Sequence, residues 1–397
     1  MKDLLFVSPI NPFAPDNGSA IRIASLLDEL VDSWRVTMLC LSAPSKPEDP
    51  PAHIKEKLNR LFLLRNSRSR KTARLRWAVG AMPYRSYLID FRAASGYRSA
   101  VTEIRKMHFD RILCHLQETL PVLQDLNADP NITWLDTQNW DRDWCRSFMT
   151  SNSLVQRLYG SVEIRRRAQF ETRFFKYAKN VIYVSPEDKV SALKIFPDHR
   201  HEVVPNGVSN RFFNAGTRLV EQSAKQRTSS TVLFVGSLDV EMNIGGVEWL
   251  VNEVWPHVRS QNPGLKLHLV GRNPNPRVTQ LQSEDVILFG NVADVMPHYE
   301  SAGCVVVPGF VGGGSKLKVL EALATGLPIV STQFGVVGLP DSICDRVLIE
   351  DDPVRFAAGV LQMHNRPVVV PKSVLQEFRW TAVGSRLDAL LRSDIRT

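Results

Sequence analysis

Short apolar runs rich in β-branched residues alternate along the chain with longer stretches in which apolar residues recur every three or four positions. Runs of the first kind are typical of buried strands, and stretches of the second kind are typical of amphipathic helices. The sequence therefore predicts an α/β fold with parallel sheets built from strand–helix–strand units. The expected strands lie near residues 4–8, 36–41, 111–115, 132–136, 181–184, 202–204, 232–236, 266–270, 286–289, 304–307, 328–331 and 346–349.

These strands fall into two halves separated by a turn. Pro205, Asn206 and Gly207 follow the last strand of the first half, and a polar stretch precedes the next strand. A length of 397 residues is sufficient for two domains that each bury a core. We therefore expect two doubly wound, Rossmann-like domains, residues 1–205 and residues 206–375, facing a central cleft.

A glycine-rich turn before an expected helix, within residues 312–330, is the most informative segment. Glycines let several backbone amides converge on one anion, and a helix N-terminus adds its positive end. Two lysines add charge, and a glutamate about one turn into the helix can accept hydrogen bonds from a ribose. The segment predicts a nucleotide diphosphate site, and the alternative is an ordinary turn before a solvated helix. Its residues are Gly312, Gly313, Gly314, Ser315, Lys316, Leu317, Lys318 and Glu321.

This segment resembles the donor-site signature of family 4 glycosyltransferases, which are retaining nucleotide-sugar enzymes of the GT-B fold. It is most similar to the branch whose motif runs GGG, a small hydroxyl residue, Lys or Arg, an apolar residue, Lys and then LEALA. Other segments follow in the family's order and spacing, at residues 203–208, 234–238, 269–272, 288–292 and 378–380. The resemblance implies that residues 206–375 bind the donor and that a C-terminal helix, about residues 376–397, packs back on the first domain.

The resemblance also implies a set of donor-binding and catalytic residues. Gly236, Ser237, Asn243 and Arg272 match loops of the donor domain, beside the glycine-rich segment. The chain departs from the family at Gly313, where many members have a glutamate. It also has Ser237 and Asn243 where many have an arginine and a lysine for the diphosphate. We therefore assign the charge at the leaving group to Lys316, with Lys318 and Arg272 as alternatives.

In the first half, the candidate residues follow expected strands, where ligands of open α/β sheets gather. Gly18 opens a helix after a proline-rich loop and matches a glycine of the family, although the loop needs no ligand to explain it. His115 and Asp136 end strands and are expected on the rim of the cleft. His115 is the candidate catalytic histidine, for the donor sugar or the acceptor hydroxyl. Asp136 is equally a candidate helix cap, and Glu118 is a further acceptor-side candidate.

The net charge of +8 arises from residues 57–89, which hold nine basic residues and no acid. Aromatic and apolar residues within this stretch suit the headgroup region of an anionic membrane. The alternatives are a solvated basic face and a nucleic-acid site, for which no accompanying motif is present. We expect a membrane or lipid-linked acceptor to contact Arg65, Arg68, Arg70, Lys71, Arg74, Arg76 and Trp77.

Other sequence features restrict the location and the chemistry. No apolar run approaches the length of a transmembrane helix, and the first apolar run is too short for a secretory signal. We therefore expect a cytoplasmic protein that associates peripherally with the inner face of the cell membrane. Five scattered cysteines without CxxC spacing indicate neither a zinc site nor a disulfide framework.

These features predict a metal-independent, retaining glycosyltransferase without a cofactor. It would move a sugar from a nucleotide diphosphate sugar to a glycan or lipid-linked acceptor, in bacterial surface polysaccharide or glycolipid assembly. A sugar-nucleotide epimerase of similar architecture and a non-catalytic nucleotide-sugar-binding protein are the alternatives. A dehydrogenase is disfavoured because the chain lacks a GxGxxG dinucleotide fingerprint.

Overall fold

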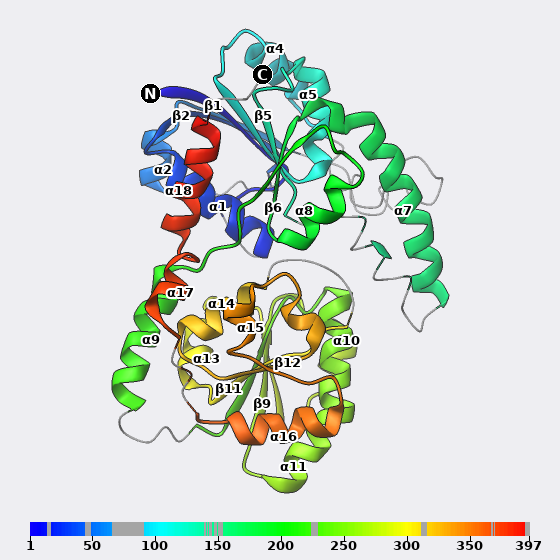
Figure 1. Cartoon of the computed structure of the whole chain (residues 1–397), viewed down its shortest axis with the longest axis vertical. Coiled ribbons are helices and arrows are strands. Elements are labelled where there is room, and N and C mark those ends of the chain that lie inside the picture. Colours follow the sequence, from blue (N-terminus) through cyan, green and yellow to red (C-terminus); the bar gives the residue numbers. More distant parts are fainter. Residues whose placement is uncertain are drawn as a thin grey trace. The chain divides into compact units, whose positions relative to one another are not determined.

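The chain forms two compact units, each built around one parallel sheet (Figure 1). The computed structural model describes residues 1–13, 17–43, 49–65, 91–138, 140, 142, 145–146, 149, 154–223, 229–310, 316–366, 368 and 370–393. The first unit holds the described residues up to Pro205 and those from Val383 onward. The second unit holds the described residues from Asn206 to Ala382.

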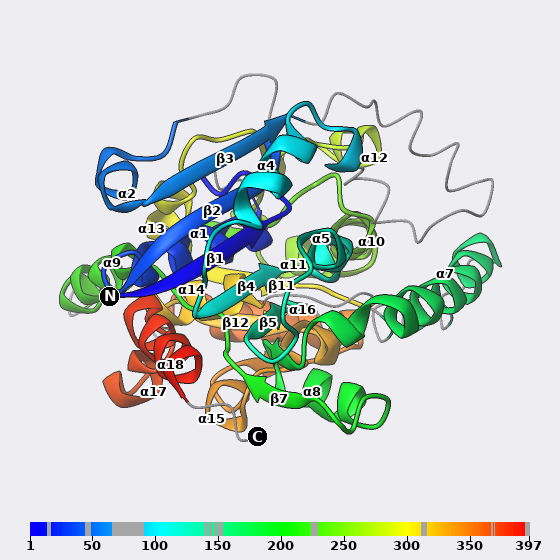
Figure 2. The same cartoon turned by 90° about the horizontal axis from the view of Figure 1, so that it is seen from above.

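The sheet of the first unit has the strand order β3-β2-β1-β4-β5-β6-β7 (Figure 2). Every neighbouring pair is parallel, and His115 at the end of β4 lies opposite Asp136 at the end of β5. The strands are β1 (Lys2–Ser8), β2 (Trp34–Ala43), β3 (Arg60–Arg65), β4 (Arg111–His115), β5 (Thr133–Asp136), β6 (Asn180–Tyr183) and β7 (Arg200–Val203). The main helices are α1 (Gly18–Leu30), α2 (Ala52–Lys57), α4 (Tyr97–Ile104), α5 (Leu120–Leu126), α7 (Leu154–Phe174) and α8 (Pro186–Leu193).

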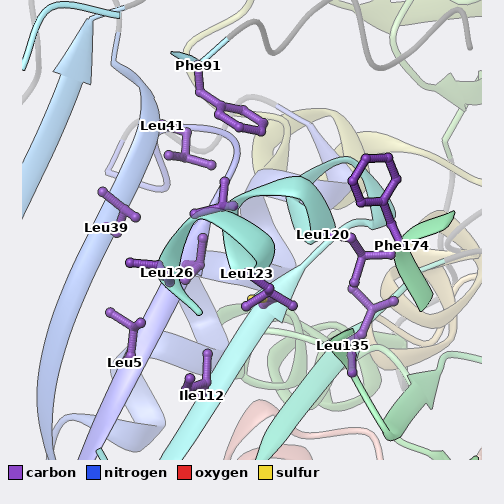
Figure 3. Packing of buried hydrophobic residues seen from close by; sticks show 14 of the residues in the cluster. Leu5, Leu39, Leu41, Phe91, Ile112, Leu120, Leu123, Leu126, Leu135 and Phe174 are labelled. Atoms are coloured by element: carbon purple, nitrogen blue, oxygen red, sulfur yellow. The ribbon is translucent and has the colours of Figure 1, made fainter. Parts of the chain in front are cut away.

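The main apolar core of the first unit lies where α4 and α5 cover one face of the sheet (Figure 3). Leu5, Leu39 and Ile112 from the strands pack there with Leu123 and Leu126 from α5. The inner strands β1 and β4 are buried on both faces, so their central residues are continuously apolar rather than alternating.

The C-terminal helix α18 (Trp380–Arg392) packs within the first unit from Val383 onward. The indole nitrogen of the buried Trp34 donates to the Asp388 carboxylate at 2.6 Å, and Arg111 donates to the carbonyl of Leu391 at 2.7 Å. A Cβ at Gly384 would lie 2.4 Å from the Cβ of Glu29 on α1, so this glycine permits the close approach of the two helices.

The sheet of the second unit has the order β10-β9-β8-β11-β12-β13 and is also parallel throughout. Its strands are β8 (Thr231–Val235), β9 (Lys266–Gly271), β10 (Val286–Gly290), β11 (Cys304–Val307), β12 (Ile329–Ser331) and β13 (Leu348–Ile349). Its helices are α9 (Asn210–Ser223), α10 (Glu241–Trp249), α11 (Trp255–Gln261), α12 (Pro276–Thr279), α13 (Met296–Ser301), α14 (Leu317–Ala324), α15 (Asp341–Cys344), α16 (Pro353–Met363) and α17 (Lys372–Gln376). Separate apolar cores lie on the two faces of this sheet.

The twelve predicted strands are all confirmed, and the prediction missed β3. The apolar residues at the start of the basic stretch were assigned to a membrane surface, but they form this edge strand, where Leu64 is 5% exposed. Lys57 and Arg60, also in the stretch, pair with Asp32 and Glu103. The side chain of Arg65 and the residues Arg68, Arg70, Lys71, Arg74, Arg76 and Trp77 lie outside the described residues. No helix in the described part of the chain is long and apolar enough to cross a membrane.

Candidate functional site

The candidate site of the second unit lies where the strand order reverses. Strand β8 lies between β9 and β11, and the chain leaves β8 toward α10 and leaves β11 toward α14. Connections that run in opposite directions from two neighbouring parallel strands leave a crevice beyond their carboxyl ends. The predicted donor residues that the structure describes in this unit lie in the loops and helices at these ends.

Two glycines, Gly236 and Gly271, allow the loops after β8 and β9 to approach closely. A Cβ at Gly271 would lie 1.8 Å from the carbonyl oxygen of Gly236, which would displace one of the two backbones. A Cβ at Gly236 would lie 3.1 Å from both the ammonium nitrogen of Lys318 and the side-chain nitrogen of Asn243. Gly236 therefore lies directly beside the predicted cation of α14.

Four of the predicted residues form one hydrogen-bonded chain that joins α14 and α10 to the loops after β8 and β9. The Lys318 ammonium donates to Asn243 Oδ1 at 3.3 Å, and Asn243 Nδ2 donates to the carbonyl of Ser237 at 2.9 Å. Arg272 Nε donates to the Ser237 hydroxyl at 3.0 Å. Asn243 and Ser237 thus orient two of the three candidate cations, Lys318 and Arg272.

Lys318 is partly buried and lies 4.5 Å from the centroid of the Phe234 ring. Burial lowers the pKa of its ammonium from the usual 10.5 to about 8, and the neighbouring Lys316 adds to this effect. Strongly shifted pKa values in a crevice are typical of functional groups. At neutral pH the group is a cation in surroundings that disfavour cations.

Glu321 is held by a residue that the sequence analysis missed. The hydroxyl of the fully buried Tyr299, on α13, donates to Glu321 Oε2 at 3.0 Å. Burial raises the pKa of Glu321 to about 6, although the Tyr299 hydrogen bond and the charges of Lys318 and Arg211 act against this rise. A buried tyrosine implies a partner for its hydroxyl, but the sequence does not say which one.

The start of α14 contains the remaining predicted residues. Lys316 occupies the N-cap position, and its ammonium lies 5.0 Å from the centroid of the Phe334 ring. Leu317 is 8% exposed and packs inward. The residues Gly312, Gly313, Gly314 and Ser315 lie outside the described residues, so their role in anion binding stays a prediction.

In the first unit, His115 and Asp136 are fully buried rather than exposed on a rim. Asp136 accepts two hydrogen bonds from the Arg22 guanidinium, at 2.8 and 2.9 Å, and a third from His115 Nδ1 at 3.0 Å. Arg22 also donates to the carbonyls of Val204 and Pro205, where the chain leaves the unit. Asp136 is therefore an ion-pair partner, and Arg22 is a residue that the sequence analysis missed.

In this buried group, the positive charge of Arg22 compensates the negative charge of Asp136. Burial acts to raise the pKa of Asp136, but the Arg22 charge and the His115 hydrogen bond outweigh it and lower the pKa to about 2. Burial lowers the pKa of His115, which keeps its imidazole neutral, and Nε2 has no partner among the described residues. The neutral ring with Nδ1–H bonded to Asp136 presents Nε2 as an acceptor.

The two other candidates of the first unit lie on separate elements. Gly18 is the first residue of α1, after Asn17, whose side chain caps the helix by accepting from the backbone NH of Ala20 at 3.0 Å. Glu118 is 3% exposed and accepts from Arg167 on α7 at 3.2 Å.

Comparisons with known proteins agree with this architecture. Residues 229–366 match the model of the family described as glycosyl transferases group 1. The chain is similar over its length to sucrose-phosphate synthase from Thermosynechococcus elongatus, at 17% identity and a TM-score of 0.69, covering 99% of this chain and 98% of that one. It is also similar to HepE of Anabaena in complex with UDP and glucose, at 13% identity and a TM-score of 0.61, covering 99% and 100%. The two Rossmann-like sheets are therefore those of the GT-B fold, and the family match supports a glycosyltransferase.

Two curated relatives are more similar in sequence. An uncharacterized 44.6 kDa protein in the cps region of Klebsiella pneumoniae is 25% identical over 66% of this chain and 68% of its own length. The MMP alpha-(1->4)-mannosyltransferase of Mycolicibacterium hassiacum is 26% identical over 61% of this chain and 59% of its own length. The second relative is itself a glycosyltransferase.

Proposed function

We propose that this protein transfers a sugar, with retention of the anomeric configuration, from a nucleotide diphosphate sugar to an acceptor hydroxyl. The observation that carries the proposal is the presence of two oriented charges on α14 at the reversal point of the second sheet: Lys318, which donates to Asn243, and Glu321, which accepts from Tyr299. A cation for a diphosphate and a carboxylate for a ribose are what a nucleotide diphosphate requires. The family match of residues 229–366 supports the same assignment.

In this proposal the second unit binds the leaving nucleotide and stabilises its charge. Glu321 accepts hydrogen bonds from the ribose hydroxyls, while Lys316, Lys318 and the amides at the start of α14 contact the diphosphate. The bond between the anomeric carbon and the phosphate oxygen breaks as the acceptor oxygen bonds to that carbon from the same face. A phosphate oxygen takes the acceptor proton, so that no protein base is required. His115 is fully buried and bonded to Asp136, so the proposal gives it no contact with the donor or the acceptor.

The relatives support a nucleotide-sugar donor and a role in surface polysaccharide or glycolipid assembly. One of the similar structures contains UDP and glucose, one relative is a mannosyltransferase, and another belongs to a cps region. We propose a hexosyl donor, a glycan or lipid-linked acceptor, and a position at the inner face of the cell membrane.

The deciding experiment identifies the nucleotide and then the product. Thermal shift with UDP, GDP, ADP and their sugars should select one nucleotide, because a specific ligand stabilises the folded state. With the selected donor and a panel of acceptors, NMR of the product should show the donor's anomeric configuration. An inverted product would refute retention. An epimerised donor without acceptor would select the epimerase, and binding without transfer or hydrolysis would select the non-catalytic alternative.

The proposed reaction requires neither metal nor cofactor, because lysines and backbone amides supply the charge at the leaving group. Transfer should therefore persist in excess EDTA at its rate in buffer. Loss of transfer in EDTA that manganese restores would contradict this part of the proposal.

A further inference from the structure

Helix α7 exposes apolar side chains on a part of the first unit that no predicted site uses. Leu154 and Leu158 are each 67% exposed, and Val162 is 41% exposed. Residues four apart on an α-helix lie about 40° apart around its axis, so these three form one stripe about 12 Å long. The N-terminal half of α7, which carries the stripe, extends away from the sheet of its unit (Figures 1 and 2).

The inward side of the same helix holds charged residues. Glu163 and Glu171 are fully buried and Arg167 is 1% exposed. Arg167 pairs with Glu118, and Glu171 accepts from Arg142 at 2.5 Å. Phe170 and Phe174 of the same helix pack in the core, as is usual for the inward side of a surface helix. The three buried charges and the exposed apolar stripe reverse the usual arrangement.

The exposed charge of α7 has one sign. Its two acids, Glu163 and Glu171, are both buried, whereas Arg157, Arg165 and Arg173 are exposed. By helical spacing Arg157 lies beside the apolar stripe, and Arg165 continues its face three residues beyond Val162. Arg173 lies two further turns along the helix, near the same face. Exposed leucines bordered by arginines suit the interface of an anionic bilayer, where apolar side chains enter the acyl boundary and guanidinium groups stay among the headgroups.

We propose that the Leu154–Leu158–Val162 stripe of α7 docks on the surface of an anionic lipid bilayer. The inference goes beyond the proposed reaction, because it assigns membrane contact to a described surface outside the basic stretch of residues 57–89. It does not depend on the nucleotide site, which lies in the other unit. A protein partner is disfavoured because the arginines are matched by the uniform negative charge of a lipid surface.

Vesicle co-sedimentation of the full chain tests the proposal. The probes are vesicles of phosphatidylglycerol and phosphatidylethanolamine, with phosphatidylcholine vesicles as the neutral comparison. The test variant is Leu154→Glu/Leu158→Glu, and the matched control is Val354→Glu, whose side chain is 53% exposed on α16 of the second unit. Thermal midpoints establish that each variant folds, and nucleotide-induced thermal shift reports the other site separately.

Wild type and Val354→Glu should sediment with the anionic vesicles and remain in solution with the neutral ones. The double variant should partition at least about tenfold less, since two apolar side chains no longer enter the bilayer. Arg165→Glu should weaken binding, and added salt should weaken it in wild type. Equal partitioning of wild type and the double variant would overturn the proposal. A wild-type dimer by light scattering that becomes a monomer in the double variant, without vesicle binding, would assign the stripe to a second copy instead.

Discussion

Replacing Lys318 by methionine should stabilise the protein while weakening its nucleotide binding. The pKa of Lys318 falls from 10.5 to about 8 on folding, mainly through burial. At about 1.4 kcal/mol per pH unit, holding the ammonium in place costs at most about 3.5 kcal/mol. Because the folded pKa is below the unfolded one, this cost is present in full below pH 8 and disappears as the pH rises toward 10.5.

The expected net gain in Lys318→Met is smaller than this upper bound. The ammonium is only partly buried, so solvent screening reduces the cost. Methionine also loses the contact with the Phe234 ring, about 0.5–1 kcal/mol, and the hydrogen bond to Asn243. We expect a net stabilisation of about 1 kcal/mol at pH 7, or about 2–4 °C in thermal midpoint for a domain of this size. The difference from wild type should shrink at pH 10.

Thermal unfolding and calorimetric titration with the selected nucleotide measure the two effects on the same samples. Nucleotide affinity should fall at least about tenfold, since a charge-assisted contact to phosphate contributes about 1.5–3 kcal/mol. The matched control is Lys266→Met, which removes a half-buried lysine of the same unit that donates to the carbonyl of Glu284 at 3.2 Å. It should change neither quantity appreciably. A Lys318→Met protein that is less stable than wild type, or that binds nucleotide with unchanged affinity, would refute the reasoning.

Three further results are expected. The affinity for the nucleotide sugar should be highest between about pH 6 and about pH 8, because Glu321 takes up a proton below this range and Lys318 loses one above it. Glu321→Gln should remove only the fall in affinity on the acid side, and Lys318→Met only the fall on the alkaline side. Tyr299→Phe removes a hydrogen bond that lowers the pKa of Glu321, so the fall in affinity on the acid side should begin at a higher pH in titration calorimetry. If the tyrosine were purely structural, the pH of this fall would not change. Arg22→Met should lower the free energy of unfolding by about 3–5 kcal/mol in denaturant titrations, because Asp136 would remain buried without its guanidinium; a midpoint near wild type would show that the pair contributes little.

The parts of the site that the sequence predicted share one property, which is that each is encoded locally. Lys318 and Glu321 lie on one helix directly after a glycine-rich turn, so a short pattern identifies both. Gly236 and Arg272 follow apolar runs that were recognisable as strands, and parallel strands bring their carboxyl ends to one edge of a sheet.

The residues that were missed depend on contacts that a linear pattern does not contain. Arg22 lies 114 positions from Asp136, and nothing in its amphipathic helix distinguishes it from a solvated arginine. Tyr299 reaches Glu321 from a neighbouring helix 22 positions away. Strand β3 was misjudged for another reason, because the arginines at both of its ends were interpreted as part of a basic surface. Charged residues are a normal feature of edge strands, and the four apolar residues between them were the available signal.

The pKa shifts of the two units separate a structural ion network from a site prepared for a charged ligand. In the first unit the carboxylate of Asp136 is favoured by Arg22 and His115, so that its pKa falls to about 2 and the protein itself neutralises the charge. In the second unit Lys318 and Glu321 attract one another, yet burial still shifts both toward their neutral forms. Charged residues whose ionised form is destabilised by folding are expected mainly where a ligand stabilises that form. A diphosphate beside Lys318 and a ribose beside Glu321 would stabilise the ionised forms of these two residues. By this criterion the buried Asp136 pair stabilises the fold, and we propose that the charges around α14 serve nucleotide binding.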